Sequence, residues 1–222
     1  MKKYILFLMS AWLIQFTAFA QSKVIEVFPE QGKDNENLAS ALEQAAGYKG
    51  KPVTIKLSPG TYQLDRDKSA QVLYYISNTT SETDDPDPTK HIGLHLHSLK
   101  NVTVDGCGST LLMTGEMTSF VVNQCEGITL KNLNIDFKYP TQTEVEVMEE
   151  GRDYLIVQVH PTSQYRIVDE QLEWYGDGWS FKGGIAQSYD RVSNMTWRSW
   201  SPMENLIRAV ELRPNVLYLQ YR

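Results

Sequence analysis

The sequence of 222 residues has few cysteines, few histidines and no clustered basic residues. Two cysteines are too few for a disulfide-rich scaffold, and they form no C-x-x-C pair of the kind that binds zinc. The 21 lysines and arginines are scattered, which argues against a nucleic-acid-binding surface. The formal net charge of −6 disfavours a polyanionic ligand and favours neutral or basic partners.

Long apolar runs are also absent, except at the N-terminus. Lys2 and Lys3 precede an apolar run over residues 4–16, and Ala18-Phe19-Ala20 has the small-x-small pattern of a cleavage site. We therefore predict a signal peptide over residues 1–20 and an exported protein, periplasmic or extracellular, in a bacterium. The alternative is a buried N-terminal helix or a retained anchor. No other run approaches a bilayer span, so we expect no membrane span after removal of the signal peptide.

What the chain does contain is a near-repeat between His91 and Phe137. The stretch HIGLHLHSLKNVTVDGCGSTLLM is followed, at an offset of roughly 26 residues, by MTSFVVNQCEGITLKNLNIDF. This offset aligns five apolar pairs, namely Leu94 with Phe120, Leu96 with Val122, Leu99 with Cys125, Val102 with Ile128 and Val104 with Leu130. Apolar and polar residues alternate within each copy, which is typical of strands with one buried face. The pattern predicts two stacked coils of a right-handed parallel β-helix, a pectin-lyase-like solenoid.

The segment before the repeat supports this all-β class. A short alternating strand over residues 24–28 precedes an amphipathic helix, which the polar residues 34–37 are expected to cap and Gly47 to end. A second strand over residues 53–57 then leads into a Pro59-Gly60 turn. We expect the helix to cap the open N-terminal end of the solenoid. Residues 21–140 are thus predicted to form the first coils.

The pattern changes after Pro140. Two alternating runs flank residues 150–153, which indicates an antiparallel hairpin, and short strands with Gly176-Asp177-Gly178 turns follow. We predict an inserted antiparallel β-barrel-like subdomain over residues 141–189 and a return to the β-helix over 190–222. Because no closing cap is recognisable before Arg222, we expect a truncated, N-terminal fragment of a longer protein.

Several segments together resemble glycoside hydrolase family 110, the secreted bacterial α-1,3-galactosidases. These segments are YYISNTTSE, the run HIGLHLHSLKNVTVDGCGSTLLMTGEMTSFVVNQCEGITLKNLNIDFKYPTQTEVEV, and ENLIRAVELRPNVLYL. The resemblance covers residues 24–222. It implies a parallel β-helix with antiparallel barrel insertions. It also implies a hydrolase that removes terminal α-1,3-linked galactose, with inversion and without a cofactor, from blood-group B or linear α-galactosyl oligosaccharides and glycoconjugates.

The resemblance implies catalytic carboxylates in later coils, and none of those positions matches this sequence. We nevertheless considered five acidic residues as candidates. Asp105 lies in an Asp-Gly turn, where aspartate is favoured for turn geometry alone, and Asp136 lies on a strand and aligns with Thr110. Glu144 and Glu146 share one side of a strand, and Glu116 lies between coils. The structural explanation is favoured for each, so the sequence assigns no catalytic residue.

The sequence patterns for a metal site or a reactive thiol are equally weak. His91, His95 and His97 alternate along one strand, but no carboxylate has matching spacing. Asp84, Asp85 and Asp87 could bind calcium, although the polar segment 77–90 fits a solvated loop better. Cys107 and Cys125 occupy apolar phases, with Cys107 aligned to Leu133, and are expected to be small buried side chains. We expect no metal site and no cofactor.

Four tryptophans are the stronger candidates for sugar binding, because aromatic rings stack on the apolar faces of sugars. They are Trp174, Trp179, Trp197 and Trp200, with Arg191 and Arg198 nearby as hydrogen-bond donors. The alternative, that they pack the insertion onto the solenoid, is favoured for each, so the substrate-binding residues stay unassigned.

Two alternatives to an α-1,3-galactosidase remain open. One is a non-catalytic glycan-binding or surface β-helix protein. The other is a different β-helix polysaccharide-degrading enzyme, such as a pectate-type lyase, although the coils lack the aligned basic residues and calcium-binding acids that a lyase needs. The sequence leaves the oligomeric state open.

Overall fold

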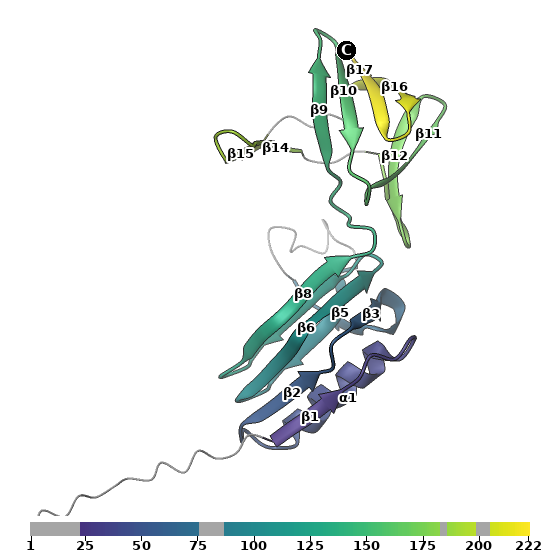
Figure 1. Ribbon diagram of the computed structural model, residues 1–222. Coiled ribbons are helices and arrows are strands. Elements are labelled where there is room, and N and C mark those ends of the chain that lie inside the picture. Colours follow the sequence, from purple (N-terminus) through teal and green to yellow (C-terminus); the bar gives the residue numbers. More distant parts are fainter. Residues whose placement is uncertain (1–22, 76–86, 183–185, 199–204) are drawn as a thin grey trace, which may run out of the picture.

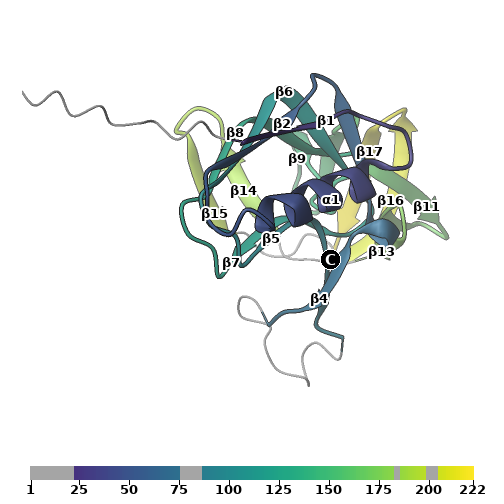
Figure 2. The same cartoon turned by 90° about the horizontal axis from the view of Figure 1, so that it is seen from below.

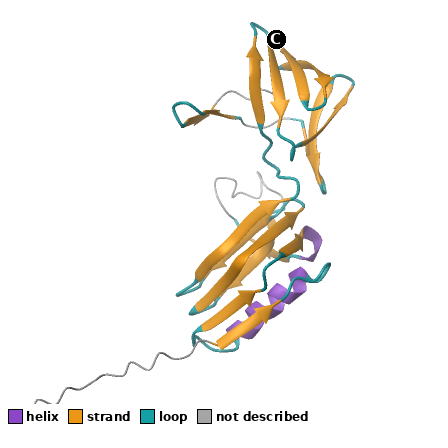
Figure 3. Ribbon diagram, in the orientation of Figure 1, coloured by secondary structure: helices purple, strands orange, loops and turns teal. Residues whose placement is uncertain are grey.

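A computed structural model describes residues 23–75, 87–182, 186–198 and 205–222. These residues form mostly β-strands, with one α-helix, α1 (Asp34–Ala46), and one 3-10 turn, η1 (Arg66–Lys68) (Figure 3). The all-β class is therefore as expected. The strands gather in two groups, and the chain passes from one to the other over residues 138–144 (Figure 1). The predicted signal peptide lies outside the described residues.

The N-terminal group is built mainly from parallel strands. One sheet joins β1, β2, β3, β6 and β8, and all of its pairings are parallel. A second sheet joins β4, β5 and β7, in which β5 and β7 are parallel and β4 pairs antiparallel with β5. The strands are β1 (Lys23–Val27), β2 (Val53–Leu57), β3 (Thr61–Asp65), β4 (Ala70–Leu73), β5 (Thr89–His97), β6 (Val102–Thr114), β7 (Thr118–Asn123) and β8 (Thr129–Phe137).

The two copies of the near-repeat lie on neighbouring parallel strands and pair in register. Leu94 pairs with Phe120, Leu96 with Val122, and Val104 with Leu130, as the alignment predicts. Equivalent side chains of the two copies therefore lie beside each other on adjacent parallel strands. The pairing places both copies on the same sheets, where like residues can share one core.

The offset of 26 residues between the two copies of the repeat does not continue beyond Asp105. The register shifts there, so that Leu133 pairs with Ser109 instead of Cys107, and Asp136 pairs with Leu112 instead of Thr110. The cause is a bulge in β6, where Cys107 has φ 49° and Gly108 has φ 85°. Two extra residues are taken up at this point, and a position with positive φ is one that glycine adopts without strain.

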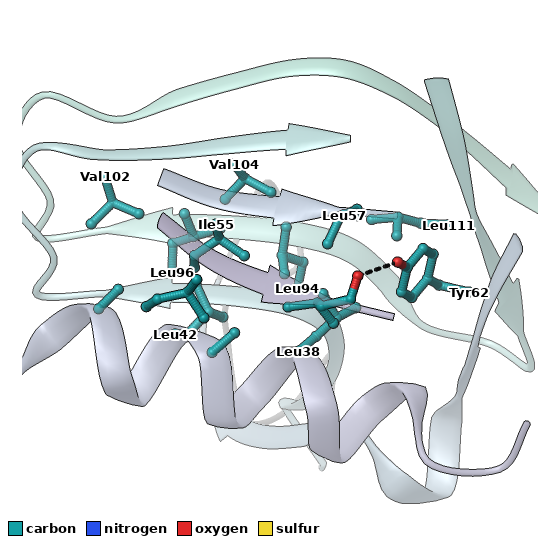
Figure 4. Packing of buried hydrophobic residues seen from close by; sticks show 14 of the residues in the cluster. Leu38, Leu42, Ile55, Leu57, Tyr62, Leu94, Leu96, Val102, Val104 and Leu111 are labelled. Atoms are coloured by element: carbon teal, nitrogen blue, oxygen red, sulfur yellow. Dashed lines mark hydrogen bonds between the residues drawn. The ribbon is translucent and has the colours of Figure 1, made fainter. Parts of the chain in front are cut away.

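The core of the N-terminal group lies between the two sheets and α1 (Figure 4). Seen from below, α1 lies across the end of the ring of strands (Figure 2). It contributes Leu38, Ala41, Leu42 and Ala45, which are buried at helical spacing. The helix thus covers that end of the core, and its role as the cap of a solenoid stays a prediction.

The ends of α1 differ in detail from the expectation. The N-cap residue is Lys33, which makes no side-chain capping bond. The buried Asp34 carboxylate instead accepts hydrogen bonds from the backbone N–H groups of Glu30, at 2.7 Å, and Gln63, at 2.9 Å. Gly47 is the C-cap residue, but with φ −60° it continues the right-handed turn. Asp34 therefore joins the start of the helix to β3 and to Glu30, which precedes the helix.

Burial is unequal between the two copies of the repeat. Leu94 and Leu96 are 2% and 0% exposed, whereas their partners Phe120 and Val122 are 44% and 45% exposed. Ile135 in β8 is likewise exposed. Within the described residues, β7 and β8 lie at the edges of their sheets and pair on one side only. The alternation correctly predicted the phase of the apolar residues but not this open edge.

This difference gives a stability prediction. Leu96→Ala should lower the free energy of unfolding by about 2–5 kcal/mol, because it leaves a cavity in a packed core. Its register partner is the matched control: Val122→Ala should cost about 1 kcal/mol or less, since much of that side chain is already in water. Urea denaturation followed by circular dichroism measures both. Equal losses would contradict the assigned core.

The C-terminal group is antiparallel throughout. One sheet has the order β16-β17-β10-β9, a second β11-β12-β13, and β14 pairs with β15. The hairpin predicted around residues 150–153 is present as β9 and β10. The strands are β9 (Val145–Glu150), β10 (Tyr154–Val159), β11 (Gln164–Val168), β12 (Gln171–Gly176), β13 (Trp179–Phe181), β14 (Gln187–Asp190), β15 (Met195–Arg198), β16 (Leu206–Arg213) and β17 (Val216–Tyr221).

The expected return of residues 190–222 to the parallel strands is not met in the described residues. β17 pairs antiparallel with both β10 and β16, and its Leu217 and Leu219 belong to the second core, with Val157 and Trp174. The physical reason is that alternation predicts a strand with one buried face but not its partner or direction. The turn at Asn215, with φ 61°, joins β16 directly to β17. The division of the chain into domains stays a prediction.

Candidate functional site

Asp105 has the contacts of a structural anion. Its Oδ1 accepts hydrogen bonds from the Cys107 backbone N–H, at 3.1 Å, and from Asn132 Nδ2, at 2.9 Å, while Lys131 Nζ lies 3.1 Å from Oδ2. These partners, Asn132 first, lower the pKa of Asp105 to about 2. Asn132 and Lys131 come from the next strand, β8, so the carboxylate ties the bulge of β6 to its neighbour.

The other four candidate acids are dispersed. Asp136, on β8, accepts a hydrogen bond from the Phe137 backbone N–H at 2.8 Å, and Glu116 is exposed in the turn between β6 and β7. Glu144 is exposed just before β9, and Glu146, on β9, pairs with Arg191 at 2.8 Å. The structure therefore does not gather the five acids into one cleft.

The three histidines of β5 all have close contacts with protein groups. His91 Nδ1 lies 3.0 Å from the Arg66 carbonyl oxygen, and His95 Nε2 lies 3.1 Å from Tyr74 Oη. His97 stacks on His95 with ring centroids 5.6 Å apart. Burial, and then the proximity of His97, lowers the pKa of His95. In the described part of the chain, no group of three or more His, Cys, Asp or Glu side chains could hold a metal ion.

The acidic loop and the two cysteines supply no further candidate site in the described residues. Asp84 and Asp85 lie outside the described residues, and Asp87 accepts a hydrogen bond from the Thr89 backbone N–H at 3.1 Å. Cys107 and Cys125 are free thiols and half-buried. Cys125 Sγ accepts a hydrogen bond from the Leu99 backbone N–H at 3.3 Å, which matches the predicted alignment of these two residues.

The tryptophans divide between core and surface. Trp174 is 5% exposed in the second core, and Trp179 is half-buried and stacks on Phe181 with centroids 5.5 Å apart. Trp197 on β15 is 50% exposed. Trp200 lies outside the described residues, whereas Arg198 is exposed on β15 beside Trp197. Trp174 thus packs inside the second core, whereas the Trp197 ring is half open to solvent.

Comparison with known proteins shows which enzymes this chain is related to. No protein-family profile matches the chain. The α-1,3-galactosidase A of Bacteroides thetaiotaomicron is 80% identical over 97% of the chain. The chain is a homologue of the α-1,3-galactosidases. The α-1,3-galactosidase B of Phocaeicola vulgatus is 31% identical over 98% of the chain, and the α-1,3-galactosidase A of Bacteroides fragilis is 30% identical over 86%.

The resemblance to the α-1,3-galactosidases that the sequence motifs indicated is confirmed. The chain spans 38% of the length of the Bacteroides thetaiotaomicron relative and 37% of the Phocaeicola vulgatus relative. The homology therefore concerns one part of these longer enzymes.

Six described acids of this homologue are poorly suited to one glycosidase role, that of the general acid. A glycosidase needs a general acid with a raised pKa, beside a second carboxylate. Several carboxyl groups here shift the opposite way, because hydrogen bonds and neighbouring cations lower their pKa values. They are Glu30, Asp87, Asp105, Glu126, Glu173 and Asp190. The surroundings of these six acids therefore favour the ionised form, unlike those of a general acid.

Sequence reasoning missed two hollows in the surface. One, of about 290 Å³, lies between α1 and β5 and has a mainly apolar lining that includes Leu38, Leu42 and Leu94. The other, of about 270 Å³, is polar and is lined by Pro161, Ser163, Gln164, Tyr165, Glu211 and Asn215. We call the second one the Tyr165 pocket. Its residues come from β11, β16 and the adjoining turns, so no local motif could have revealed it.

The environment of Asp105 predicts a pH effect. Its pKa of about 2 lies below the unfolded value of about 3.9, so its contribution to stability is present above pH 4 and is lost as the pH falls towards 2. Asp105→Asn should therefore flatten the decline of the unfolding free energy across this interval. Asp67→Asn is the control, since that carboxylate makes only an exposed ion pair with Arg66. Parallel acid declines for wild type and Asp105→Asn would contradict the assignment.

The two classes of tryptophan can be separated by mutation. Trp174→Ala should lower the free energy of unfolding by about 3–5 kcal/mol, the usual cost of emptying a core aromatic site. Trp197→Ala should change it by no more than about 0.5 kcal/mol, because half of that side chain is in water. Thermal and urea unfolding measure both variants. A large loss for Trp197→Ala would assign it to packing.

Proposed function

We propose that this chain forms part of an exported glycoside hydrolase of family 110 that releases terminal α-1,3-linked galactose from blood-group B or linear α-galactosyl glycans, with inversion. The observation that carries the proposal is the 80% identity over 97% of the chain to an α-1,3-galactosidase. At this identity the fold and most contacts of the matched region are retained. Export follows from the N-terminal pattern of Lys2, Lys3 and the Ala18-Phe19-Ala20 site.

The architecture proposed for this enzyme is a right-handed parallel β-helix. In-register parallel strands in two sheets, a repeat of 26 residues and a helix over one end support it. The exposed Phe120, Val122 and Ile135 at the opposite edge are in phase with buried residues. In the longer relatives, a further coil laid on β7 and β8 would bury them and pair their free backbone groups.

Such a β-helix can supply the geometry of an inverting glycosidase. Adjacent strands lie about 4.8 Å apart, so carboxylates in phase two coils apart approach the upper end of the roughly 6.5–9.5 Å separation that leaves room for the attacking water. No acid of this chain is assigned that role. We place the catalytic pair on further coils of the longer enzymes.

The partners proposed are α-galactosyl oligosaccharides and glycoconjugates, without nucleic acid. The net charge is negative and the basic residues are scattered, which argues against a nucleic-acid partner. Neither described helix has the length and apolarity of a bilayer span.

A second candidate function is glycan binding without hydrolysis. It is favoured by the lowered pKa values of the acids and by the exposed Trp197 on β15. An aromatic ring half in water can stack on a sugar without taking part in chemistry.

A chimera tests the enzymatic proposal. The part of the Bacteroides thetaiotaomicron α-1,3-galactosidase A that aligns with residues 23–222 of this chain would be replaced by those residues. It should release galactose from galactose-α-1,3-galactose at a rate within about tenfold of the parent, a difference of about 1.4 kcal/mol in barrier. Proton NMR of the first product should show the β-anomer, as inversion requires.

The 222-residue chain alone is the comparison. It should release no galactose, because the catalytic pair is proposed to lie on further coils of the longer enzymes. A folded chimera without activity would contradict the assignment of the chain to this enzyme, and an α-anomeric first product would contradict inversion. Activity of the chain alone would place a catalytic pair within it.

A further inference from the structure

The Tyr165 pocket is organised by one hydrogen-bond network. Tyr165 Oη donates to Glu211 Oε1 at 2.6 Å, and the Asn215 backbone N–H donates to Tyr165 Oη at 3.1 Å and to Glu211 Oε1 at 3.3 Å. Burial, and then the nearby carboxylate, raise the pKa of Tyr165 to about 12. The phenol therefore stays protonated and remains a donor to Glu211 at any physiological pH.

Contacts with neighbouring residues hold the lining of the Tyr165 pocket in place. The Tyr165 ring meets the buried Trp174 edge-on, with centroids 6.1 Å apart. Ser163 is also buried, and its Oγ accepts a hydrogen bond from the Glu144 backbone N–H at 3.3 Å. Gln158 Nε2 donates to the Asn215 carbonyl oxygen at 2.9 Å. A ligand would thus meet a preformed surface and would have little side-chain ordering to drive.

The lining defines the chemistry of a ligand. Glu211 supplies a carboxylate acceptor, Gln164 and Asn215 supply amide groups that both donate and accept, and Tyr165 supplies an aromatic face and a hydroxyl. No lysine or arginine lines it, which disfavours an anion. Dense donors and acceptors beside one aromatic ring match a neutral polyhydroxylated ring. The volume of about 270 Å³ equals roughly nine liquid waters, enough for one sugar unit.

We propose that the Tyr165 pocket is a sugar-binding site that takes a single neutral hexose unit of an α-galactosyl glycan. The proposal rests on the proposed function for the choice of glycan, and on the pocket itself for the site. Glu211 and the amides of Gln164 and Asn215 would bond the ring hydroxyls, and the Tyr165 ring would lie against the apolar face of the sugar.

The test is titration of the 222-residue chain with galactose-α-1,3-galactose, followed by two-dimensional NMR of the backbone amides. Shifts should be confined to residues 161–165 and 211–215. Tyr165→Phe and Glu211→Gln should each weaken binding by about tenfold, the cost of one hydrogen bond to a charged group.

The sheet that carries Glu211 offers a matched control. Tyr154 Oη donates to Glu149 Oε1 at 2.5 Å, which is the same kind of phenol–carboxylate pair away from the Tyr165 pocket. Tyr154→Phe and Glu149→Gln should leave the dissociation constant unchanged. Thermal unfolding of all four variants verifies that each is folded.

The outcomes separate this proposal from the proposed function. Binding that is equal in wild type and in folded Tyr165→Phe and Glu211→Gln would overturn the pocket. Absence of any shift at residues 161–165 and 211–215 would overturn it as well. In either case a chimera that releases galactose keeps the enzymatic assignment. Conversely, pocket binding together with an inactive chimera would support the site and leave the galactosidase proposal refuted.

Discussion

The structure depends on parallel strand pairing in which equivalent residues of successive segments lie side by side. Ile55 pairs with Val104 and Val104 with Leu130, so one column of apolar side chains crosses three strands. Each strand buries its apolar face only because a neighbour covers it. The gradient from fully buried Leu96 to half-exposed Val122 follows directly, since β7 is covered on one side and open on the other within the described residues.

The polar residues of this region serve that same stacking. Asp105 is held by Lys131 and Asn132 of the next strand at the point where the register shifts. Asp34 joins α1 to β3. The lowered pKa of Asp105 is the electrostatic mark of this role, because each neighbour stabilises the ionised form. It separates Asp105 from a general acid, whose surroundings must favour the protonated form.

The antiparallel part of the chain is organised differently. Its core forms where strands distant in sequence meet, as β10 with β17. Its surface carries both an exposed tryptophan and the Tyr165 pocket. Features that suit glycan recognition are thus concentrated in the antiparallel part, whereas the parallel part of the chain supplies a regular scaffold.

The sequence alone determined the strand phase, the capping helix, the offset of 26 residues and the kinship with the α-1,3-galactosidases, because periodicity and motifs are local properties. Tertiary structure decided the rest. The shortened offset beyond Asp105 depends on a bulge with positive φ, and the antiparallel partner of residues 216–221 depends on which edge was free. The Tyr165 pocket needs Tyr165 and Glu211, which are 46 residues apart in sequence. Alternation specifies which face of a strand is buried, but only the folded chain specifies which residues that face packs against.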